Sequence, residues 1–415
     1  MHRKLFTAIA VAVAATMALP SAAAQAGDDD GQPTLEGRAV IPAGALADGP
    51  PSGASVVPNP QNGVEFPRPS QPVIGFSGVV AGRQQGEYLA MPDNGFGNKA
   101  NSADFLIRAY YVRPDFKTAK GGSGTVAVDT HQGEFIEFRD PDHVIGFPIV
   151  NEATPRRLLT GADIDPESLQ RGSNGDLWLG DEFGPWILHF DAAGRLLDAP
   201  FATPGGLMSP ANPFLGTNPA TQPNSRGYEA MGISPNGAFL YATLEGATVA
   251  DGTGSTRRIV FEFSTRDEAF TGRTWEYRTE QPAYLVADMW VIDRHHILVI
   301  ERDAGRGLAA VFRNVYMVDL TAVDASGALV KTPLVDLAAI PDPDLVSLPE
   351  IHDGDVGLGD PFRVTCESVE SVHAVSGAKL LITCDNNFPN SGRNPAIPDD
   401  TEMIVVKVPD LRERD

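Results

Sequence analysis

Short apolar runs recur along the chain, and a turn usually separates each run from the next. In residues 161–185, for example, one run includes Leu169 and the next begins at Leu177, with Ser173-Asn174-Gly175 between them. Apolar runs of about four to eight residues bounded by Gly, Asn, Asp or Pro are typical of β-strands, and two such runs around a short turn predict a β-hairpin. Long amphipathic helical patterns are hard to find. The pattern therefore predicts an all-β protein.

Five of the predicted hairpins share a further feature, because an acidic or small polar residue opens the first strand and an acidic residue closes the second. They run from 77 to 93, 167 to 181, 229 to 245, 288 to 301 and 367 to 385. The separations are 16, 14, 16, 13 and 18 residues, with the turn near each midpoint. Residues equidistant from a hairpin turn are cross-strand neighbours, so the opening and closing residues should meet at the same end of each hairpin.

Further strand candidates follow most of these hairpins. Examples lie at 105–112, 186–190, 258–263 and 315–320. Repeated units of about four antiparallel strands predict a β-propeller, here with five recognised blade hairpins and five or six blades. The last unit lacks an obvious fourth strand, which residues 35–41 would supply. Two stacked β-sandwich domains are the alternative, but they would not explain acids at the same end of every hairpin.

The N-terminal residues have the composition of a secretory signal peptide. His2-Arg3-Lys4 precedes an apolar, alanine-rich run from Leu5 to Leu19, and Ala24-Gln25-Ala26 fits a cleavage site. The apolar run is shorter than the roughly 20 residues of a membrane-spanning helix. We expect a signal peptide at 1–26, a Pro-, Gly- and Asp-rich leader at 27–70, and the propeller at 71–410. The protein should be secreted or extracytoplasmic, with no integral membrane span.

The charge of the chain indicates which partners to expect. The sequence has 54 acidic and 32 basic residues, which gives a formal net charge of −22. Such a chain should repel nucleic acid and anionic membranes, so we expect neither as a partner. Calcium is the expected cofactor, because it binds hard oxygen ligands and suits an exported protein. A surface whose acids merely keep a secreted protein soluble is the alternative.

The acids of the five hairpins form the candidate metal site. The first two strands of each propeller blade lie nearest the central channel, so their shared ends should surround one mouth of it. Carboxylates that are crowded in this way stay ionised only beside a cation. The predicted calcium ligands are Asp93, Asn94, Glu167, Glu229, Glu245, Glu301, Asp303, Glu367 and Asp385. For each of them, a strand cap or an Asx-turn is the alternative.

Basic residues beside these acids predict a small anionic substrate. Calcium can bridge phosphate oxygens and activate a water molecule, which suits a phosphate ester. We expect Lys99 and Arg226 to bind the substrate, Arg302 to act at the reaction centre, and Asp181 or Glu182 to serve as general base. A solvated charge or a salt bridge to a neighbouring acid is the alternative for each basic residue.

Other hydrolase mechanisms lack their motifs in this sequence. It contains no Gly-x-Ser-x-Gly elbow, no His-Glu-x-x-His zinc motif and no phosphate loop ending in Gly-Lys-Ser/Thr. The two cysteines, Cys366 and Cys384, adjoin Glu367 and Asp385 on the last predicted hairpin. Their spacing is compatible with a disulfide and with two free thiols.

Several of these segments resemble the phytase-like family described as "esterase-like activity of phytase". They are GFSGVV (75–80), DNGFGNKANSADF (93–105), LTGADIDPES (159–168), LWLGDEFGPW (177–186), RGYEAMGISPNG (226–237), VIERD (299–303) and CDNNFP (384–389). The resemblance covers about residues 73–408. It implies a β-propeller and the hydrolysis of phosphate esters. The residue roles given above come from the pairing pattern and not from the family.

The sequence leaves three functions open. The expected one is a secreted, calcium-dependent hydrolase of phosphate esters that uses carboxylates at one channel mouth. The second is a calcium-dependent lactonase or esterase propeller, which should have a narrower and more neutral mouth. The third is a non-catalytic propeller that binds a ligand and uses calcium structurally. Arg226, Arg302 and Lys99 favour the first, because a phosphatase needs cations beside its carboxylates.

Overall fold

The computed structural model describes residues 31–376, 378–409 and 411. The chain divides into two units, residues 1–31 and 32–415, and the second contains all of the strands described below. The predicted signal peptide at 1–26 lies outside the described residues. Among the described residues, no helix is long and apolar enough to cross a membrane.

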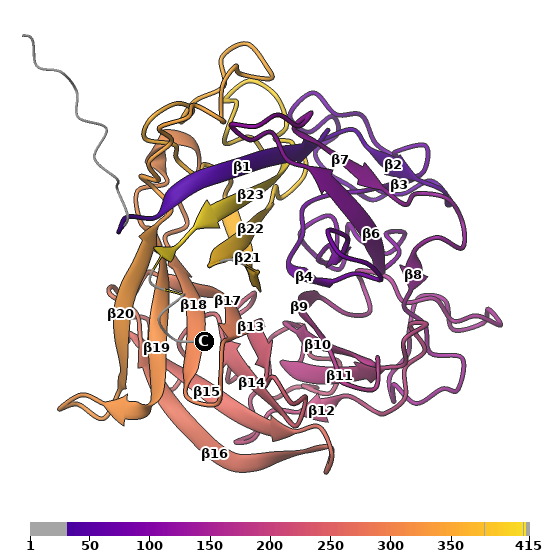
Figure 1. Ribbon diagram of the computed structural model, residues 1–415. Helices are drawn as coiled ribbons and strands as arrows, with labels where there is room; N and C mark the ends of the chain where they lie inside the picture. The colour runs from indigo at the N-terminus through magenta and orange to yellow at the C-terminus, as the bar shows by residue number, and fades with distance from the viewer. Residues whose placement is uncertain (1–30, 377, 410, 412–415) are drawn as a thin grey trace, which may run out of the picture. The chain divides into compact units, whose positions relative to one another are not determined.

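The strands form five antiparallel four-stranded units, as the repeating pattern predicted, and the first and last units are joined into one larger sheet (Figure 1). The first comprises β4 (Gly78–Ala81), β5 (Tyr88–Met91), β6 (Arg108–Asp115) and β7 (Thr125–Val128). The second comprises β9 (Pro166–Arg171), β10 (Leu177–Asp181), β11 (Trp186–Phe190) and β12 (Phe201–Ala202). The third comprises β13 (Tyr228–Ile233), β14 (Phe239–Leu244), β15 (Arg257–Ser264) and β16 (Ala269–Arg278). We call these sheets blades one to three.

The described residues also form two further blades and a few short elements. Blade four comprises β17 (Leu285–Val291), β18 (His296–Arg302), β19 (Arg313–Val323) and β20 (Leu329–Asp336). Blade five comprises β21 (Ser368–Val375), β22 (Lys379–Asp385), β23 (Thr401–Lys407) and β1 (Thr34–Ile41). The short elements are β2 (Leu46–Ala47), β3 (Gln71–Pro72), β8 (Ile136–Glu137) and the 3-10 helix η1 (Gly307–Ala309).

The innermost strands of the blades form a closed ring. β4 contacts β9, β9 contacts β13, β13 contacts β17, β17 contacts β21, and β21 returns to β4. Figure 1 shows these five strands around the centre of the propeller. Each blade begins with its innermost strand, so all five hairpins present the same end to one mouth of the channel.

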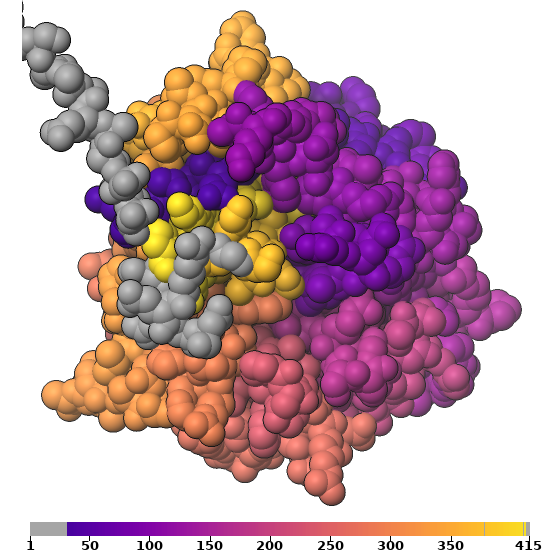
Figure 2. All heavy atoms as spheres, in the orientation of Figure 1, coloured from indigo at the N-terminus to yellow at the C-terminus, as the bar shows by residue number. Residues whose placement is uncertain are grey.

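The N-terminal strand closes the ring. β1 pairs antiparallel with β23, from Thr34 beside Lys407 to Ile41 beside Thr401. In Figures 1 and 2 the indigo β1 lies next to yellow strands from the other end of the chain. The strand expected over residues 35–41 therefore completes the last blade. A single parallel pairing, Val40 with Thr125 of β7, also links blade five to blade one.

Position in the blade explains the composition of the strands. All five residues of β10 are buried, because neighbouring blades cover both faces of an inner strand. The outer strand β16 is mostly exposed and carries Arg273, Glu276 and Arg278. The outer strand β20 carries Lys331 and Pro333. Charged residues and proline on an outer strand discourage further strand pairing, so blades three and four end at these strands.

A disulfide joins Cys366 to Cys384 in blade five. It links the segment before β21 to the end of β22 near the channel mouth. The sequence left this pairing open. The bond closes a loop of 18 residues, which in the chain-entropy model stabilises the fold by about 3 kcal/mol.

Candidate active site

A β-bulge interrupts the innermost strand of four blades near the same end. The pairing register shifts within β9, β13, β17 and β21, and each shift leaves one residue of the strand without a direct cross-strand partner. The four bulge residues, in blade order, are Glu167, Glu229, Ala287 and Glu370. A bulge adds a residue and redirects its side chain. The three glutamates all line the cavity at the channel mouth.

The second strand of each of these hairpins adds another residue to the cavity. On each second strand, one residue pairs with the inner-strand residue that directly precedes the bulge. In blade order these second-strand residues are Asp181, Leu244, Glu301 and Cys384. The next residue along the chain lines the cavity, and in blade order these residues are Glu182, Glu245, Arg302 and Asp385. Equivalent backbone positions in blades two, three and five thus carry acids, and in blade four an arginine.

The cavity at the mouth has a volume of about 270 Å³. Its nine carboxylates are Asp93, Asp165, Glu167, Glu182, Glu229, Glu245, Glu367, Glu370 and Asp385. Two arginines, Arg226 and Arg302, also line it, together with Asn94. Acids therefore far outnumber the basic side chains in this open-mouthed cavity.

Three overlapping groups of oxygen atoms lie close enough together to share a cation. They are Asp93, Asp165 and Glu167; Glu167, Glu229 and Glu370; and Glu182, Glu229 and Glu245. In each group, one carboxylate oxygen per residue lies within 4.8 Å of the others. Glu167 and Glu229 each belong to two groups, so the three sets are contiguous.

Burial and mutual repulsion make these carboxylates difficult to ionise. Burial raises the pKa of Asp93 to about 7, and the charge of Glu370 adds to the effect. Burial followed by the charges of neighbouring acids likewise raises the pKa of Asp165 and of Glu167 well above the usual range. The pKa values of Glu182, Glu229 and Asp385 are raised for the same two reasons, and burial raises that of Glu245 although Arg226 and Arg302 oppose it. An added cation would remove both penalties.

Arg302 is the internal counter-charge of the cavity. Its Nη2 lies 3.4 Å from Glu229 Oε1, 3.1 Å from Glu245 Oε1 and 3.3 Å from Glu370 Oε1. Burial alone would lower the pKa of Arg302, but these carboxylates raise it, so the side chain stays charged. Arg226 is more exposed, and its Nη1 lies 2.6 Å from Glu245 Oε2.

Comparison with known proteins gives the family. The family model described as "Phytase-like: Esterase-like activity of phytase" matches residues 71–388. The chain belongs to this phytase-like family. The match includes all five inner hairpins and most of the cavity residues, so the cavity lies within the family domain.

Individual relatives are distant. An "uncharacterized secreted protein" of Arthroderma benhamiae is 27% identical over 154 residues, which cover 32% of this phytase-like chain and 28% of that protein. A luciferin-regenerating enzyme is 11% identical, with 79% and 76% of the two chains covered and a TM-score of 0.36. Virginiamycin B lyase of Staphylococcus aureus is 10% identical, with 81% and 95% covered and a TM-score of 0.33. Likenesses this weak say nothing about activity.

Two predicted acids on strands of the phytase-like chain do not reach the cavity. Asp181 accepts hydrogen bonds from the backbone N–H groups of Asp165 and Gly184. Glu301 accepts from Tyr277 Oη and pairs with Lys331 Nζ at 2.6 Å. Side chains alternate between the two sides of a strand, so a position one residue too early faces the wrong way. This is why Glu182 and Arg302 line the cavity and their predecessors do not.

The other two displaced predictions lie in loops. Asp303 accepts hydrogen bonds from the N–H groups of Gly305, Val311 and Phe312, so it organises the loop after β18. Lys99 does not line the cavity, and its Nζ lies 4.3 Å from the ring centroid of Phe183. Burial lowers the pKa of Lys99, although the charge of Asp181 opposes this.

Two cavity acids escaped the sequence analysis, Asp165 and Glu370. Glu370 could have been recognised as an alternative to Glu367, because Glu367-Ser368 and Glu370-Ser371 are two copies of the same dipeptide with Val369 between them. In blades two to five, the bulge residue of the first strand and the cavity residue at or just after the end of the second strand are 15, 16, 15 and 15 positions apart, when Glu370 is taken as the bulge residue of blade five. That near-constant spacing selects Glu370 over Glu367. Asp165 precedes its strand, and no periodicity marks it.

The residues of the cavity fit calcium. The donors are carboxylates and the side chain of Asn94, all of them hard oxygen ligands. Asp165 Oδ1 is buried and has no hydrogen-bond partner, although it belongs to one of the oxygen groups described above. A buried acceptor without a partner costs about 1–3 kcal/mol, a penalty that a bound cation would remove.

Proposed function

We propose that this protein is a calcium-dependent hydrolase of phosphate esters, with its active site in the cavity at the channel mouth. Membership of the phytase-like family suggests a hydrolase-type propeller, and the cavity supports the finer proposal. The observation that carries it is the convergence of nine carboxylates, from four of the five blades and the loop before blade two, with two arginines on one cavity. Acids alone would favour only a metal site. The arginines add a means of binding an anion.

The metal would be held by the two oxygen groups that share Glu167, which leaves Glu182 free to accept a proton. Asp93, Asp165 and Glu167 form one group, and Glu167, Glu229 and Glu370 form the other. Bound calcium would offset the negative charge of the carboxylates and act as a Lewis acid toward phosphate oxygens. These residues would keep the metal fixed because all of them project from inner strands or from segments directly beside them.

The chain's own residues would orient the ester and accept a proton. Arg226 is half-exposed at the rim of the cavity and is placed to bind an entering phosphate group. Arg302, held by three carboxylates, would maintain positive charge at the base of the site. Glu182 lines the cavity and its pKa is raised by burial and by Glu245, which brings it toward the range of a general base. Asp181 is excluded from this role because its oxygens bind backbone N–H groups.

The test is phosphate release by the purified protein. Phytate and p-nitrophenyl phosphate should both be assayed with calcium and after chelation, and we expect activity that disappears on chelation and returns with calcium. Glu182→Gln should lower kcat by roughly 100-fold or more. Glu65→Gln, on the exposed surface, is the control and should have no effect. Phosphate release that persists after complete chelation would contradict the proposal.

A carboxylic ester or lactone is the second candidate substrate, and one observation favours it. A pocket of about 450 Å³ lies beside the mouth and shares Arg226 and Leu285 with the cavity. Much of its lining is apolar or small, with Ala247, Val249, Pro282 and Ala283. Phytate has no apolar part that such a pocket would bind. Turnover of aryl esters or lactones without phosphate release would favour this candidate.

We also propose that the protein is exported through its predicted signal peptide. The disulfide between Cys366 and Cys384 supports an oxidising compartment, and the relative from Arthroderma benhamiae is described as secreted. Sequencing the N-terminus of protein recovered from the culture medium tests this proposal. Cleavage near Ala26 is expected, and an intact Met1 would contradict it.

A further inference from the structure

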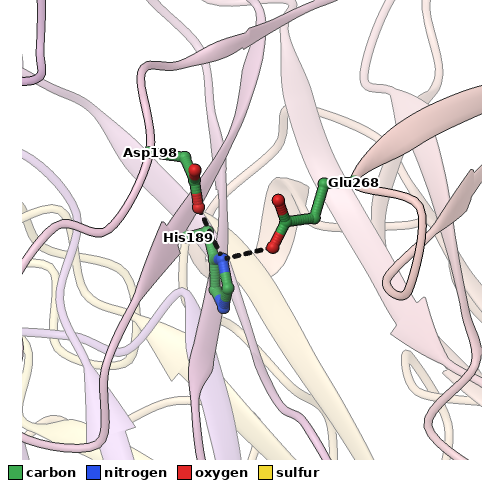
Figure 3. Close-up of side chains that lie close together, drawn as sticks. All are labelled: His189, Asp198 and Glu268. Carbon is green, nitrogen blue, oxygen red and sulfur yellow. Dashed lines mark hydrogen bonds and ion pairs between the residues drawn. The ribbon is translucent and has the colours of Figure 1, made fainter.

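A second cluster of ligand-type side chains lies at the other end of blade two, beside the turn between β9 and β10. His189 belongs to β11, Asp198 to the segment after it, and Glu268 to the turn between β15 and β16 of blade three (Figure 3). We propose that these three residues bind a divalent metal ion of the zinc class. The site is separate from the cavity at the channel mouth and takes a different type of metal.

The three donors converge on one point. His189 Nδ1 lies 3.0 Å from Asp198 Oδ2 and 3.7 Å from Glu268 Oε1. One ligand atom from each residue lies within 4.8 Å of the others. Figure 3 shows both carboxylates directed at the same ring nitrogen. The cluster is thus more than a group of acids, because an imidazole stands at its centre.

The imidazole is fixed in the orientation that a metal ligand requires. Its ring stacks on Trp178 at a centroid distance of 3.8 Å and an interplanar angle of 4°. Its other nitrogen, Nε2, lies 3.3 Å from Asp176 Oδ2. Metal-binding histidines usually donate the proton of the second ring nitrogen to a carboxylate, which leaves the first nitrogen free to bind the ion. Asp176 is placed to play this part.

The hydrogen-bond donors and acceptors of the cluster also favour a bound cation, because acceptors outnumber donors. A neutral imidazole has one N–H, and three carboxylates lie around its two nitrogens. If Asp176 accepts that proton, the lone pair of Nδ1 faces two negative charges. A divalent ion between Nδ1, Asp198 and Glu268 removes this repulsion.

The donor set selects the zinc class over calcium. Zinc binds imidazole nitrogen together with carboxylate oxygen, whereas calcium prefers oxygen alone. A pocket of about 550 Å³, lined by His189, Glu268 and Asp176 among others, adjoins the cluster. It leaves room for water as a fourth ligand. Because Glu268 comes from blade three and the other donors from blade two, the ion would also connect neighbouring blades.

The proposal is tested by titrating the purified full-length protein with zinc chloride in a calorimeter, with millimolar calcium present to occupy the mouth. We expect one zinc ion to bind per chain outside the mouth. Asp198→Asn and Glu268→Gln should each weaken binding at least 10-fold, and both residues are exposed enough to be replaced without disturbing the core. Asp176→Asn should weaken it by about 10- to 100-fold although it removes no ligand. Glu65→Gln is the matched control and should bind zinc normally.

Cobalt(II) provides an independent readout. Its visible absorption bands should appear on binding to the wild-type protein and should be lost in the Asp198→Asn variant. Zinc should also raise the Tm of the wild-type protein and leave that of Asp198→Asn unchanged. Two outcomes would overturn the proposal: no zinc binding below about 100 μM with calcium present, or binding that is equal in the wild type and both ligand variants. Either would mean that these three side chains do not form a zinc site.

Discussion

Blades two and four have the same backbone at the channel mouth and place opposite charges there. Both have a bulge in the inner strand, and both direct the residue after the paired position into the cavity. Blade two carries Glu167 and Glu182 at these positions, and blade four carries Ala287 and Arg302. The bulge therefore decides where a side chain points, and the residue at that position decides what it does. At this position blade four carries Arg302, which pairs with acids of blades three and five.

Removing that positive charge should have the largest effect. In Arg302→Met, Glu229, Glu245 and Glu370 lose the group that each of them contacts. Loss of one partner from a buried ionic network costs about 3–5 kcal/mol. We expect that decrease in the free energy of unfolding in urea without calcium, and a smaller decrease with calcium. If the decrease is the same in both conditions, calcium does not occupy the centre of this cavity.

The pH dependence of the calcium-free protein should be the next largest effect. The pKa of Asp93 rises to about 7 in the fold, and those of Glu167 and Glu182 also rise, all mainly through burial. The folded state then binds more protons than the unfolded state, so stability falls as the pH rises. Between pH 5 and pH 8 we expect a loss on the order of 2 kcal/mol, measured by urea unfolding after chelation.

Calcium should reverse this trend, since it competes with protons for the same oxygens and binds more tightly at high pH. The matching measurement is the urea midpoint at saturating calcium over the same pH range. A midpoint that falls with pH as steeply as it does after chelation would show that the acids of the cavity do not bind the metal.

The smallest expected effect distinguishes a buried carboxylate that neighbouring acids repel from one that arginines stabilise. Every neighbouring charge that shifts the pKa of Glu167 raises it, so Glu167→Gln should stabilise the calcium-free protein by about 1 kcal/mol at pH 8 and weaken calcium binding. Glu402 is the matched control, a buried glutamate whose pKa is lowered by Arg393 and Arg38 in spite of burial. Glu402→Gln should destabilise the protein. Changes of the same sign in both variants would contradict this distinction.

The sequence was sufficient for the fold because strand alternation and turns repeat in every blade. The hairpins predicted over 167–181 and 229–245 appear in the structure as β9–β10 and β13–β14, although Glu167 and Glu229 lie in bulges and do not pair as expected, and the strand near residue 35 closes blade five. These features depend on hydrophobic periodicity, so they can be predicted even when a strand boundary is misplaced by one residue. The same misplacement reverses the side of the strand that a given residue is expected to face.

The candidate site was predicted less well for that reason. Asp181 and Glu301 were chosen one residue before Glu182 and Arg302, the residues that line the cavity. A bulge adds one residue to a strand and has no periodic signature, so the choice between Glu367 and Glu370 could not be made from hydrophobicity. Only the spacing of about 15 residues, compared across blades, contained that information.

The closure of the ring by β1 affects how the site is assembled during biosynthesis. Of the described strands, β1 is synthesised before all the others, and its partner β23 is synthesised after them. Until β23 emerges, β1 lacks its antiparallel partner strand, and blade five, which supplies Glu370 and Asp385, stays incomplete. The acids of the cavity therefore come together in a closed ring only after β23 has been made. In a chain truncated before β23, the cavity carboxylates would not be held close enough to repel one another, and they would not form a complete site for the ion.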